Sequence, residues 1–348
     1  MARENKTFVL AERPKAHIVP GETFRLEKGP APTADDLKDG EILVEALYLS
    51  LDPAMRGWLN DVRSYLPPVQ IGEKMRGGAV CRVLASKNPK AKPGDFVTGF
   101  TGWTEVVILA EGQFEVREIP KGLKVTDVMG ALGMTGMTAW TGLHNIGKPK
   151  AGETVVVSGA AGATGSVAGQ IAKLRGARVI GIAGSDEKCA WLTNELGFDV
   201  ALNYKKESFK KDFIAATPNY IDMYWDNVGG EILDLALTRA AKHARFVMCG
   251  GISGYNGAGK GIQNLSIVVA QRVRMEGFIV FDYVKDYPAA QEEISRWLLE
   301  GKLKTQETIA KGGLEKAEVA IQDLFDGTNT GKLLVEIKAL DQVGGAKL

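Results

Sequence analysis

The spacing of hydrophobic residues changes character near residue 125 of this 348-residue chain. Before that point, short segments of β-branched and aromatic residues are separated by turns rich in Gly, Pro and Asp. This pattern is typical of a β-rich domain, because each strand is bounded by residues that favour turns. We expect strands at 41–49, 79–84, 96–100 and 104–109.

The later part of the chain alternates regularly between strand-like and helix-like segments. Apolar segments predict strands at 154–158, 178–183, 200–203, 220–226, 245–249 and 277–283, with helices between them, notably at 166–175 and 186–196. Such alternation predicts a parallel sheet with right-handed crossovers and helices on both faces. A further helix is expected at 289–299 and a last strand at 332–337. Because that strand has no place in the parallel sheet, we assign it to the β-rich domain.

These patterns predict an α/β chain in which one domain interrupts another. We expect a β-rich catalytic domain formed by residues 1–130 and 303–348. A nucleotide-binding domain with a doubly wound parallel sheet is expected from residues 131–302. The assignment to nucleotide binding depends on the turn that follows the strand at 154–158.

That turn carries the strongest sign of chemistry in the chain. Residues 154–173 read TVVVSGAAGATGSVAGQIAK, which predicts a buried strand, a Gly/Ala turn and a helix. This order presents the N–H groups of a helix N-terminus to the pyrophosphate of a dinucleotide. Gly159 permits the sharp turn, Gly162 lets the backbone approach the phosphates, and Gly165 lets the helix pack closely on the sheet. Ala160 takes the first glycine position of G-x-G-x-x-G, so the motif is a variant.

The end of the next strand indicates which dinucleotide binds. NAD-binding folds place an acidic residue there to bind the ribose 2′-hydroxyl. Here Gly184 and Ser185 occupy the position, Lys188 follows, and Tyr204 comes after the third strand. A hydroxyl and an ammonium attract a 2′-phosphate, so we predict NADP. Asp186 is the contrary sign, although it also fits the acidic first turn of a helix capped by Ser185.

Composition argues against several classes of function. The chain is 45% hydrophobic and 24% charged, with a formal net charge of +1, which gives no basic footprint for nucleic acid. No apolar run reaches the length of a membrane-spanning helix, and the N-terminus lacks the apolar core of a secretory signal. We therefore expect a cytoplasmic protein. The final residues Ala346-Lys347-Leu348 resemble the peroxisomal S-K-L address, which leaves import into peroxisomes open.

The residues with soft metal-binding groups are few and far apart. Cys81, Cys189 and Cys249 are the three cysteines, and no Cys or His pair has the spacing of metal ligands. Such sparse cysteines indicate a reducing compartment without a disulfide framework. We predict no metal site.

The motifs along the chain resemble those of zinc-independent medium-chain dehydrogenases/reductases, and in particular the prostaglandin reductase and alkenal/one double-bond reductase family. Zinc-dependent relatives have a cysteine ligand near a segment where this chain has Leu51, Asp52 and Pro53. The resemblance covers nearly the whole chain, and its markers are LSLDPAMRGW (49–58), PPVQIGEKMRGG (67–78), GMTGMTAWTGL (133–143), the glycine turn, GSDEK (184–188), NYK (203–205), DNVGG (226–230), CGGISGYN (249–256) and NTGKLLV (329–335).

The resemblance implies a GroES-like β-rich catalytic domain split around a Rossmann domain. It also implies NADPH-dependent reduction of the C=C bond of α,β-unsaturated aldehydes and ketones, with hydride transfer to the β-carbon and no metal. Tyr255 matches the family tyrosine near the nicotinamide ribose and the substrate carbonyl, so it is the catalytic candidate. Members of the family form homodimers, which implies sheet pairing through the strand near residues 278–281.

Further site residues follow from the same motifs. Arg56, Tyr65 and Met134 are expected to line the substrate site with Tyr255, although Arg56 also fits a structural pair and Met134 a core position. The residues implied to contact NADPH are Thr138, Gly162, Ala163, Thr164, Gly165, Ser185, Lys188, Tyr204, Asn227, Cys249, Gly250, Tyr255, Phe278, Ile279, Val280 and Asn329.

Two other functions remain open at this point. The same scaffold carries quinone and carbonyl reductases, which differ in the bond that receives the hydride. A second alternative is a protein that binds NADP without turnover, because one fold hosts many functions.

Overall fold

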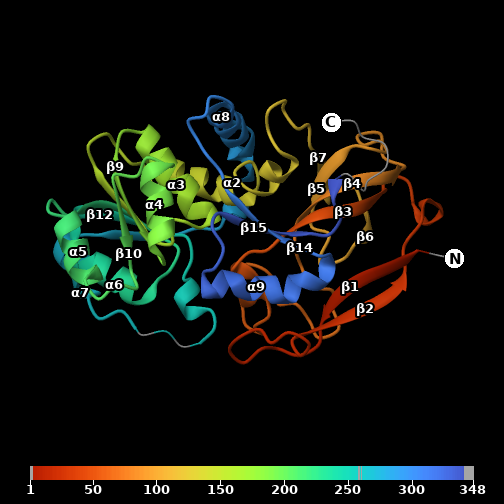
Figure 1. Cartoon of the computed structure of the whole chain (residues 1–348), viewed down its shortest axis with the longest axis horizontal. Helices are drawn as coiled ribbons and strands as arrows, with labels where there is room; N and C mark the ends of the chain where they lie inside the picture. Colours follow the sequence, from red (N-terminus) through yellow and green to blue (C-terminus); the bar gives the residue numbers. More distant parts are fainter. Residues whose placement is uncertain (1–2, 258, 260, 341–348) are drawn as a thin grey trace. The chain divides into compact units, whose positions relative to one another are not determined.

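The computed structural model describes residues 3–257, 259 and 261–340 (Figure 1). The chain divides into two compact units. The first unit combines the residues up to Met129 with Thr308–Thr328 and the segment from Leu333 onward, and the second unit combines Gly130–Glu307 with Asn329–Lys332. Residues 130, 303–307 and 329–332 thus group with the second unit, whereas the sequence analysis assigned them to the first domain. The tripeptide 346–348 lies outside the described residues.

The second unit is built on a six-stranded parallel sheet. Its order is β10-β9-β8-β11-β12-β13, and the direction of strand addition reverses between β8 and β11. This is the dinucleotide-binding order, which confirms the predicted α/β fold. The strands are β8 (Thr154–Val157), β9 (Arg178–Ala183), β10 (Val200–Asn203), β11 (Ile221–Asp226), β12 (Ala240–Met248) and β13 (Arg274–Gly277).

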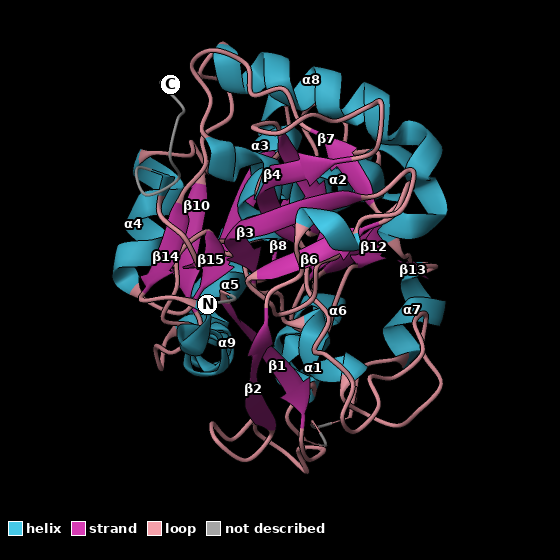
Figure 2. Cartoon of the chain, turned by 90° about the vertical axis from the view of Figure 1, so that its right-hand side faces the viewer, coloured by secondary structure: helices cyan, strands magenta, loops and turns pink. Residues whose placement is uncertain are grey.

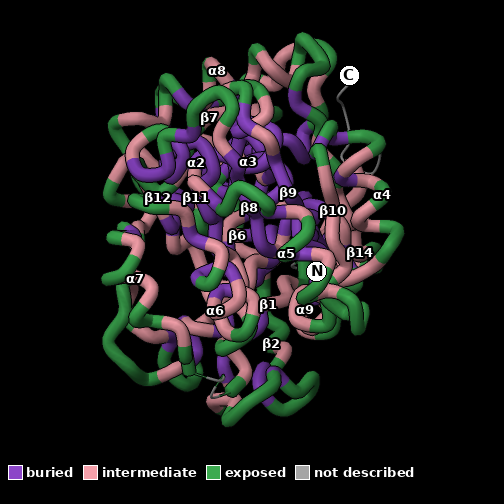
Figure 3. The backbone as a smooth tube through the Cα atoms, turned by 90° about the vertical axis from the view of Figure 1, so that its left-hand side faces the viewer, coloured by how far each residue is buried: buried purple, intermediate pink, exposed green. Residues whose placement is uncertain are grey.

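Helices cover both faces of this sheet, as the strand–helix alternation predicts. On one face, α2 (Met134–Thr141) packs against both α3 (Ala163–Leu174) and α8 (Tyr287–Leu299). Apolar residues of α5 (Phe209–Ala216), α6 (Gly230–Thr238) and α7 (Ser266–Gln271) share a core cluster with the sheet on the other. Strands β8, β9 and β11 run through the buried centre of the unit (Figure 3). Two further helical segments are α4 (Asp186–Asn194) and a π-helix at Gly142–Gly147.

The first unit is mostly antiparallel sheet. A seven-stranded sheet has the order β14-β15-β3-β4-β5-β7, with β6 also paired to β3, and β1 and β2 form a separate hairpin (Figure 2). The last strand, β15, pairs with β3, which confirms its assignment to the β-rich domain. The strands are β1 (Glu4–Leu10), β2 (Phe24–Pro30), β3 (Ile42–Ser50), β4 (Ala79–Ser86), β5 (Phe96–Gly99), β6 (Val106–Leu109), β7 (Phe114–Val116), β14 (Glu307–Lys311) and β15 (Lys332–Glu336), and the helices are α1 (Ala54–Trp58) and α9 (Ala317–Asp326).

The strand predicted at 277–283 is wrong in position. The edge strand β13 ends at Gly277, and Val280–Asp286 forms 3-10 turns instead. The apolar residues of this segment fill space beyond the sheet: Phe278 lies edge-on to Trp225 with ring centroids 6.0 Å apart, and Val280 is buried. A short apolar run predicts burial but does not distinguish a strand from another buried segment. Residues 278–281, where the resemblance implied the pairing strand, therefore form no strand, and the pairing of two copies stays a prediction.

The helices of the described residues are short or amphipathic. None of them is both long enough and apolar enough to span a membrane.

Candidate functional site

The glycine turn lies at the carboxyl end of the central strand β8. Gly159 has a φ of +57°, a conformation that glycine adopts without the steric cost of a Cβ. Helix α3 approaches this turn so closely that a Cβ on Gly165 would lie 2.4 Å from the carbonyl oxygen of Gly159. The structure thus shows the sharp turn and the close helix packing that the sequence predicts for these two glycines.

The N-terminus of α3 is open toward this turn. Gly162 is the N-cap, and no side chain at that position accepts a hydrogen bond from the first helical turn. A Cβ on Gly162 would meet just one described atom within 4 Å, the carbonyl oxygen of Gly159 at 3.3 Å. The N–H groups of the first helical turn and the positive end of the helix dipole favour an anion here. The backbone of this turn therefore fits a pyrophosphate.

A hydroxyl and two ammonium groups come together at the end of β9. Ser185 caps α4, because its Oγ accepts a hydrogen bond from the N–H of Lys188 at 3.2 Å. The ring of Tyr204 lies against Gly184, where a Cβ would be 3.2 Å from a ring carbon. Burial lowers the pKa of Lys188, and the nearby charge of Lys205 lowers that pKa further. Two like charges at a capped helix N-terminus favour a bound anion such as a phosphate.

Asp186 does not compete with an anion at this position. Its carboxylate forms a 2.8 Å ion pair with Lys206 and accepts a hydrogen bond from the side-chain amide of Asn203 at 3.1 Å. Both contacts lower the pKa of Asp186, so its charge is present and is balanced locally. The contrary sign in the sequence is thus explained by the Lys206 pair.

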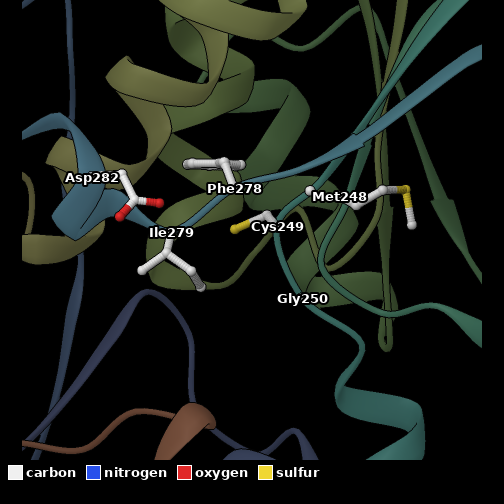
Figure 4. A pocket seen from close by; sticks show the side chains of 7 residues that line it. Met248, Cys249, Gly250, Phe278, Ile279 and Asp282 are labelled. Carbon is white, nitrogen blue, oxygen red and sulfur yellow. The ribbon is translucent and has the colours of Figure 1, made fainter. Parts of the chain in front are cut away.

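A cavity of about 420 Å³ lies at the carboxyl ends of β12 and β13 (Figure 4). Open parallel sheets bind their ligands beyond this edge. Of the residues expected to contact the cofactor, four line the cavity: Cys249, Gly250, Phe278 and Ile279. Val280, which follows Ile279 in the chain, is buried and does not line it. Asp282 adds a carboxylate to the wall, and Met248 and Gly277 complete it.

Aromatic packing fixes the wall that Phe278 provides. The Phe278 ring stands edge-on to Trp225 and to Tyr283, with centroid distances of 6.0 and 6.4 Å. Gly142, in the π-helix, lies against the same rings, because a Cβ there would be 2.6 Å from Trp225 and 2.7 Å from Phe278. A larger residue at position 142 would displace the wall.

Tyr255 lies beside this cavity in the segment that follows β12. Its hydroxyl oxygen accepts a hydrogen bond from the backbone N–H of Gly251 at 3.2 Å, and a Cβ on Gly250 would lie 3.2 Å from the same oxygen. Burial raises the pKa of the phenol, with smaller contributions from nearby Cys249 and Asp226. The hydroxyl therefore stays protonated at neutral pH and keeps a proton to donate.

The side chain of Asp226 organises the end of β11, a role that the sequence analysis missed. Its buried Oδ1 accepts hydrogen bonds from the hydroxyls of Ser158 (2.9 Å) and Tyr224 (3.2 Å). The same oxygen accepts from the backbone N–H groups of Val228 (3.1 Å) and Gly229 (2.9 Å). Oδ2 is buried and has no partner among the described residues. The acid at the end of the buried strand in DNVGG was the available signal.

The backbone of Asp226 extends this arrangement to the cavity. Its carbonyl oxygen accepts from the N–H groups of Cys249 (2.9 Å) and Gly250 (3.0 Å). One residue thus joins the glycine turn after β8 to two residues that line the cavity. Burial raises the pKa of Asp226 despite the four donors, since a carboxylate in an apolar core is poorly solvated.

Three other expected cofactor residues have side chains engaged within the second unit. The amide of Asn227 donates to the Ser158 carbonyl at 2.7 Å and accepts from the Trp225 indole at 3.1 Å. The Thr138 hydroxyl donates to a carbonyl of its own helix at 2.7 Å. The Asn329 amide donates to the carbonyl of Gly331 at 3.0 Å. Their contacts with a cofactor stay predictions.

The expected substrate residues lie in different surroundings. In the first unit, Arg56 is buried, and its guanidinium donates to the carbonyls of Pro14 and Ala16 and to the side chain of Asn60, as the structural alternative for this residue implies. Tyr65 is 43% exposed, and its hydroxyl accepts from the Trp58 indole at 2.8 Å. In the second unit, Met134 is exposed rather than part of the core, and its sulfur accepts from the Tyr287 hydroxyl at 3.7 Å. The substrate roles stay predictions.

Comparison with known proteins identifies the family. Two family models match the chain, one described as the N-terminal domain of oxidoreductase (residues 6–116) and one as zinc-binding dehydrogenase (residues 163–296). An NADPH-dependent curcumin reductase of Escherichia coli is 40% identical over 97% of this chain and 99% of that protein. An NADP-dependent 2-alkenal reductase of Nicotiana tabacum is 42% identical over 85% of this chain and 87% of that protein, and prostaglandin reductase 1 of Bos taurus is 40% identical over 86% and 90%.

Solved structures agree with this match. CurA from Vibrio vulnificus, in its complex with NADPH, has a TM-score of 0.89 and 38% identity over 96% of this chain and 99% of that chain. The chain belongs to the zinc-independent medium-chain dehydrogenase/reductase family.

In this member of the family, side chains with ligand atoms for a metal are dispersed. Among residues 3–257, 259 and 261–340, no three His, Cys, Asp or Glu residues lie close enough to hold a metal ion. The described cysteines form no disulfide. Burial raises the pKa of Cys249 to about 12 and also raises that of Cys81.

The buried Asp226 predicts an unusual pH dependence of stability. Because its folded-state pKa is raised, the protein pays no cost for it below the ordinary Asp pKa of about 4. The cost of ionising buried Asp226 develops as the pH rises from this ordinary value through the raised folded-state pKa. The free energy of unfolding therefore falls across this pH range. Asp226→Asn cannot titrate, so its free energy of unfolding should improve relative to the parent as the pH rises, measured by urea unfolding.

Asp36→Asn provides the control with the opposite sign. Contacts with Thr33 lower the pKa of exposed Asp36, so its contribution to stability is lost as the pH falls. The free energy of unfolding of Asp36→Asn should therefore decline relative to that of the parent as the pH rises. A difference between Asp226→Asn and the parent that is independent of pH would contradict the role given to burial.

Proposed function

We propose that this protein reduces the C=C bond of α,β-unsaturated aldehydes and ketones with NADPH. The observation that carries the proposal is the protonated Tyr255 hydroxyl, held beside the cavity at the carboxyl ends of β12 and β13. Relatives at about 40% identity are named as curcumin, 2-alkenal and prostaglandin reductases. All three names are those of reductases, and a 2-alkenal is an α,β-unsaturated aldehyde, which supports that substrate class.

Three groups of residues are proposed to hold the cofactor. Gly162, Ala163 and Thr164, at the open N-terminus of α3, would contact the pyrophosphate. The group at the end of β9, which includes Ser185, Lys188 and Tyr204, would bind the 2′-phosphate. The cavity walls, from Cys249 and Gly250 on one side and Phe278 and Ile279 on the other, would border the nicotinamide.

The role of Tyr255 follows from where charge develops. NADPH, when bound, supplies the hydride that adds to the electrophilic β-carbon of the substrate. Negative charge then accumulates on the carbonyl oxygen, which without a metal needs hydrogen-bond donors. Tyr255 has a proton to donate, because its oxygen accepts from Gly251 and its pKa is raised. Solvent can then protonate the α-carbon.

The decisive experiment is a screen of NADPH oxidation with product identification. Enals, enones, quinones and saturated ketones are offered separately to the purified protein. We expect oxidation with enals and enones, and products saturated at the C=C bond with the carbonyl intact. Products reduced at C=O, turnover confined to quinones, or NADPH binding without turnover would each overturn the proposal in favour of a different function.

Replacement of Tyr255 tests its place in the reaction. Tyr255→Phe removes the donor and should lower kcat roughly 10- to 100-fold. This is less than the loss of a sole oxyanion donor, because the 2′-hydroxyl of the nicotinamide ribose in bound NADPH would also donate a hydrogen bond to the carbonyl oxygen. Tyr220→Phe, at the opposite end of β11, serves as the control and should keep full activity. If hydride transfer is rate-limiting and Tyr255→Phe keeps the parent rate, Tyr255 has no part in the chemistry.

Lys188 tests the preference for the phosphorylated cofactor. Lys188→Ala removes a charge-assisted contact to the 2′-phosphate, so the KM for NADPH should rise roughly 10- to 100-fold. The KM for NADH, which lacks this phosphate, should stay the same. Lys173→Ala removes a lysine that pairs with Asp199 at 2.8 Å and should change neither value. Equal effects of Lys188→Ala on both cofactors would mean that the lysine does not contact the 2′-phosphate.

We also propose a homodimer. Strand β13 is the last in the order of the parallel sheet, so its outer edge offers backbone groups to a second copy. The pairing segment is then Arg274–Gly277. The mass of the purified protein in sedimentation equilibrium decides between a monomer and a dimer.

The cytoplasm is the proposed compartment, with peroxisomal import as the alternative because of the final tripeptide. Imaging of a fluorescent fusion with and without residues 346–348 distinguishes them. A punctate signal that depends on those residues would overturn the cytoplasmic assignment.

A further inference from the structure

A four-residue segment near the C-terminal end of the described chain hydrogen-bonds to the glycine turn. Asn329–Lys332, here called the clasp, belongs to the second unit, whereas the residues on both sides of it belong to the first. The backbone N–H of Gly331 donates to the carbonyl of Ala161 at 2.8 Å, and Gly331 pairs with Gly162 as a parallel bridge. The clasp therefore binds the turn through backbone atoms.

The clasp is held from its other side by residue 306. The N–H of Lys332 donates to the carbonyl of Gln306 at 2.9 Å. Gly331 has a φ of +68°, and a Cβ there would lie 1.9 Å from that same carbonyl oxygen. Position 331 thus has no room for a side chain, and its conformation is one that side chains disfavour.

A buried glutamine closes the arrangement into a ring. The Gln170 side chain, on α3, accepts from the N–H of Lys304 at 2.8 Å and donates to its carbonyl at 2.9 Å. It also donates to the carbonyl of Ser166, one turn nearer the N-terminus of α3. Hydrogen bonds therefore connect the turn to the clasp and the clasp to Gln306. The chain itself links Gln306 to Lys304, and the hydrogen bonds of Gln170 link Lys304 back to α3.

We propose that Gly331 and Gln170 are positioning residues for the pyrophosphate of NADPH. They touch neither the reacting atoms nor, by this proposal, the cofactor itself. Their effect is to hold the carbonyl of Ala161 inward, so that the N–H groups at the start of α3 face the phosphates without reorganisation on binding. The inference rests on the proposed use of NADPH and not on enone reduction.

The test compares two glycines whose φ angles are nearly equal, so that replacement by alanine strains the backbone similarly at both positions. Gly331→Ala places a methyl group against Gln306, whereas a Cβ on Gly327 (φ +66°), four residues earlier, would meet no described atom within 4 Å. The Kd of NADPH is measured by titration calorimetry, and so is the Kd of adenosine 2′-monophosphate, which has no pyrophosphate. The parent, Gly331→Ala and Gly327→Ala are measured alike.

We expect Gly331→Ala to bind NADPH roughly tenfold more weakly, the size of one or two lost hydrogen bonds. Its Kd for adenosine 2′-monophosphate should stay within about twofold of the parent. The residues at the end of β9 that are proposed to bind the 2′-phosphate are unchanged in this variant. Gly327→Ala should keep both values even if its melting temperature falls. Equal NADPH affinity in the two variants, or a parallel loss for both ligands in Gly331→Ala, would overturn the proposal.

Gln170→Met opens the ring at another point and keeps the test decisive if Gly331→Ala fails to fold. It should weaken NADPH roughly three- to tenfold and leave adenosine 2′-monophosphate unchanged. Gln322→Met is its matched control, since the buried Nε2 of Gln322 has no partner among the described residues. Unchanged NADPH affinity in Gln170→Met would overturn the proposal. A parent that binds NADPH but reduces no enone would instead disprove the proposed function and leave this test intact.

Discussion

The arrangement of the proposed site depends on the hydrogen bonds that the buried carboxylate of Asp226 accepts. Where a parallel sheet reverses its direction of strand addition, the loops after the two central strands diverge and leave a crevice. Asp226 ties together the elements around that crevice: the turn after β8 through Ser158, and the residues after its own strand through Val228 and Gly229. Its backbone carbonyl adds the end of β12. A buried charge is costly in isolation, so four donors on one oxygen reduce but do not abolish that cost.

The geometry of the proposed site follows from backbone groups more than from side chains. The phosphate-binding turn consists of glycines and helical N–H groups, and the amide of Asn227 is committed to Ser158 and Trp225. Side chains enter the proposed site where selectivity is needed, with Lys188 proposed for the 2′-phosphate and Tyr255 proposed for the carbonyl oxygen. Such a division is economical in entropy, because ordered backbone needs no rotamer to be fixed on binding.

Much of the fold was predictable because periodicity reports burial. The strands of the parallel sheet and the glycine turn follow from apolar runs and from glycines with defined steric roles. The segment 277–283 was mispredicted because an apolar run does not specify hydrogen bonding, and the half-buried Phe278 packs edge-on against Trp225 instead of pairing in the sheet. Asp226 and Gly331 have roles that arise from residues distant in sequence, namely Ser158 and Ala161. Local sequence patterns do not include contacts between residues so far apart in the chain, so these two roles could not be predicted from the sequence.

The clasp has a consequence for how the protein is made. The ribosome synthesises the turn at Ala161 about 170 residues before Gly331, the donor to its carbonyl, so that carbonyl lacks this partner through much of translation. Domains generally fold as soon as they are complete, but here completion of the nucleotide-binding unit waits for Asn329–Lys332. A nascent chain that has finished its parallel sheet therefore still holds an unfinished phosphate loop. With the clasp in its proposed role, coenzyme capture becomes a late event in biosynthesis, after nearly all of both units has emerged.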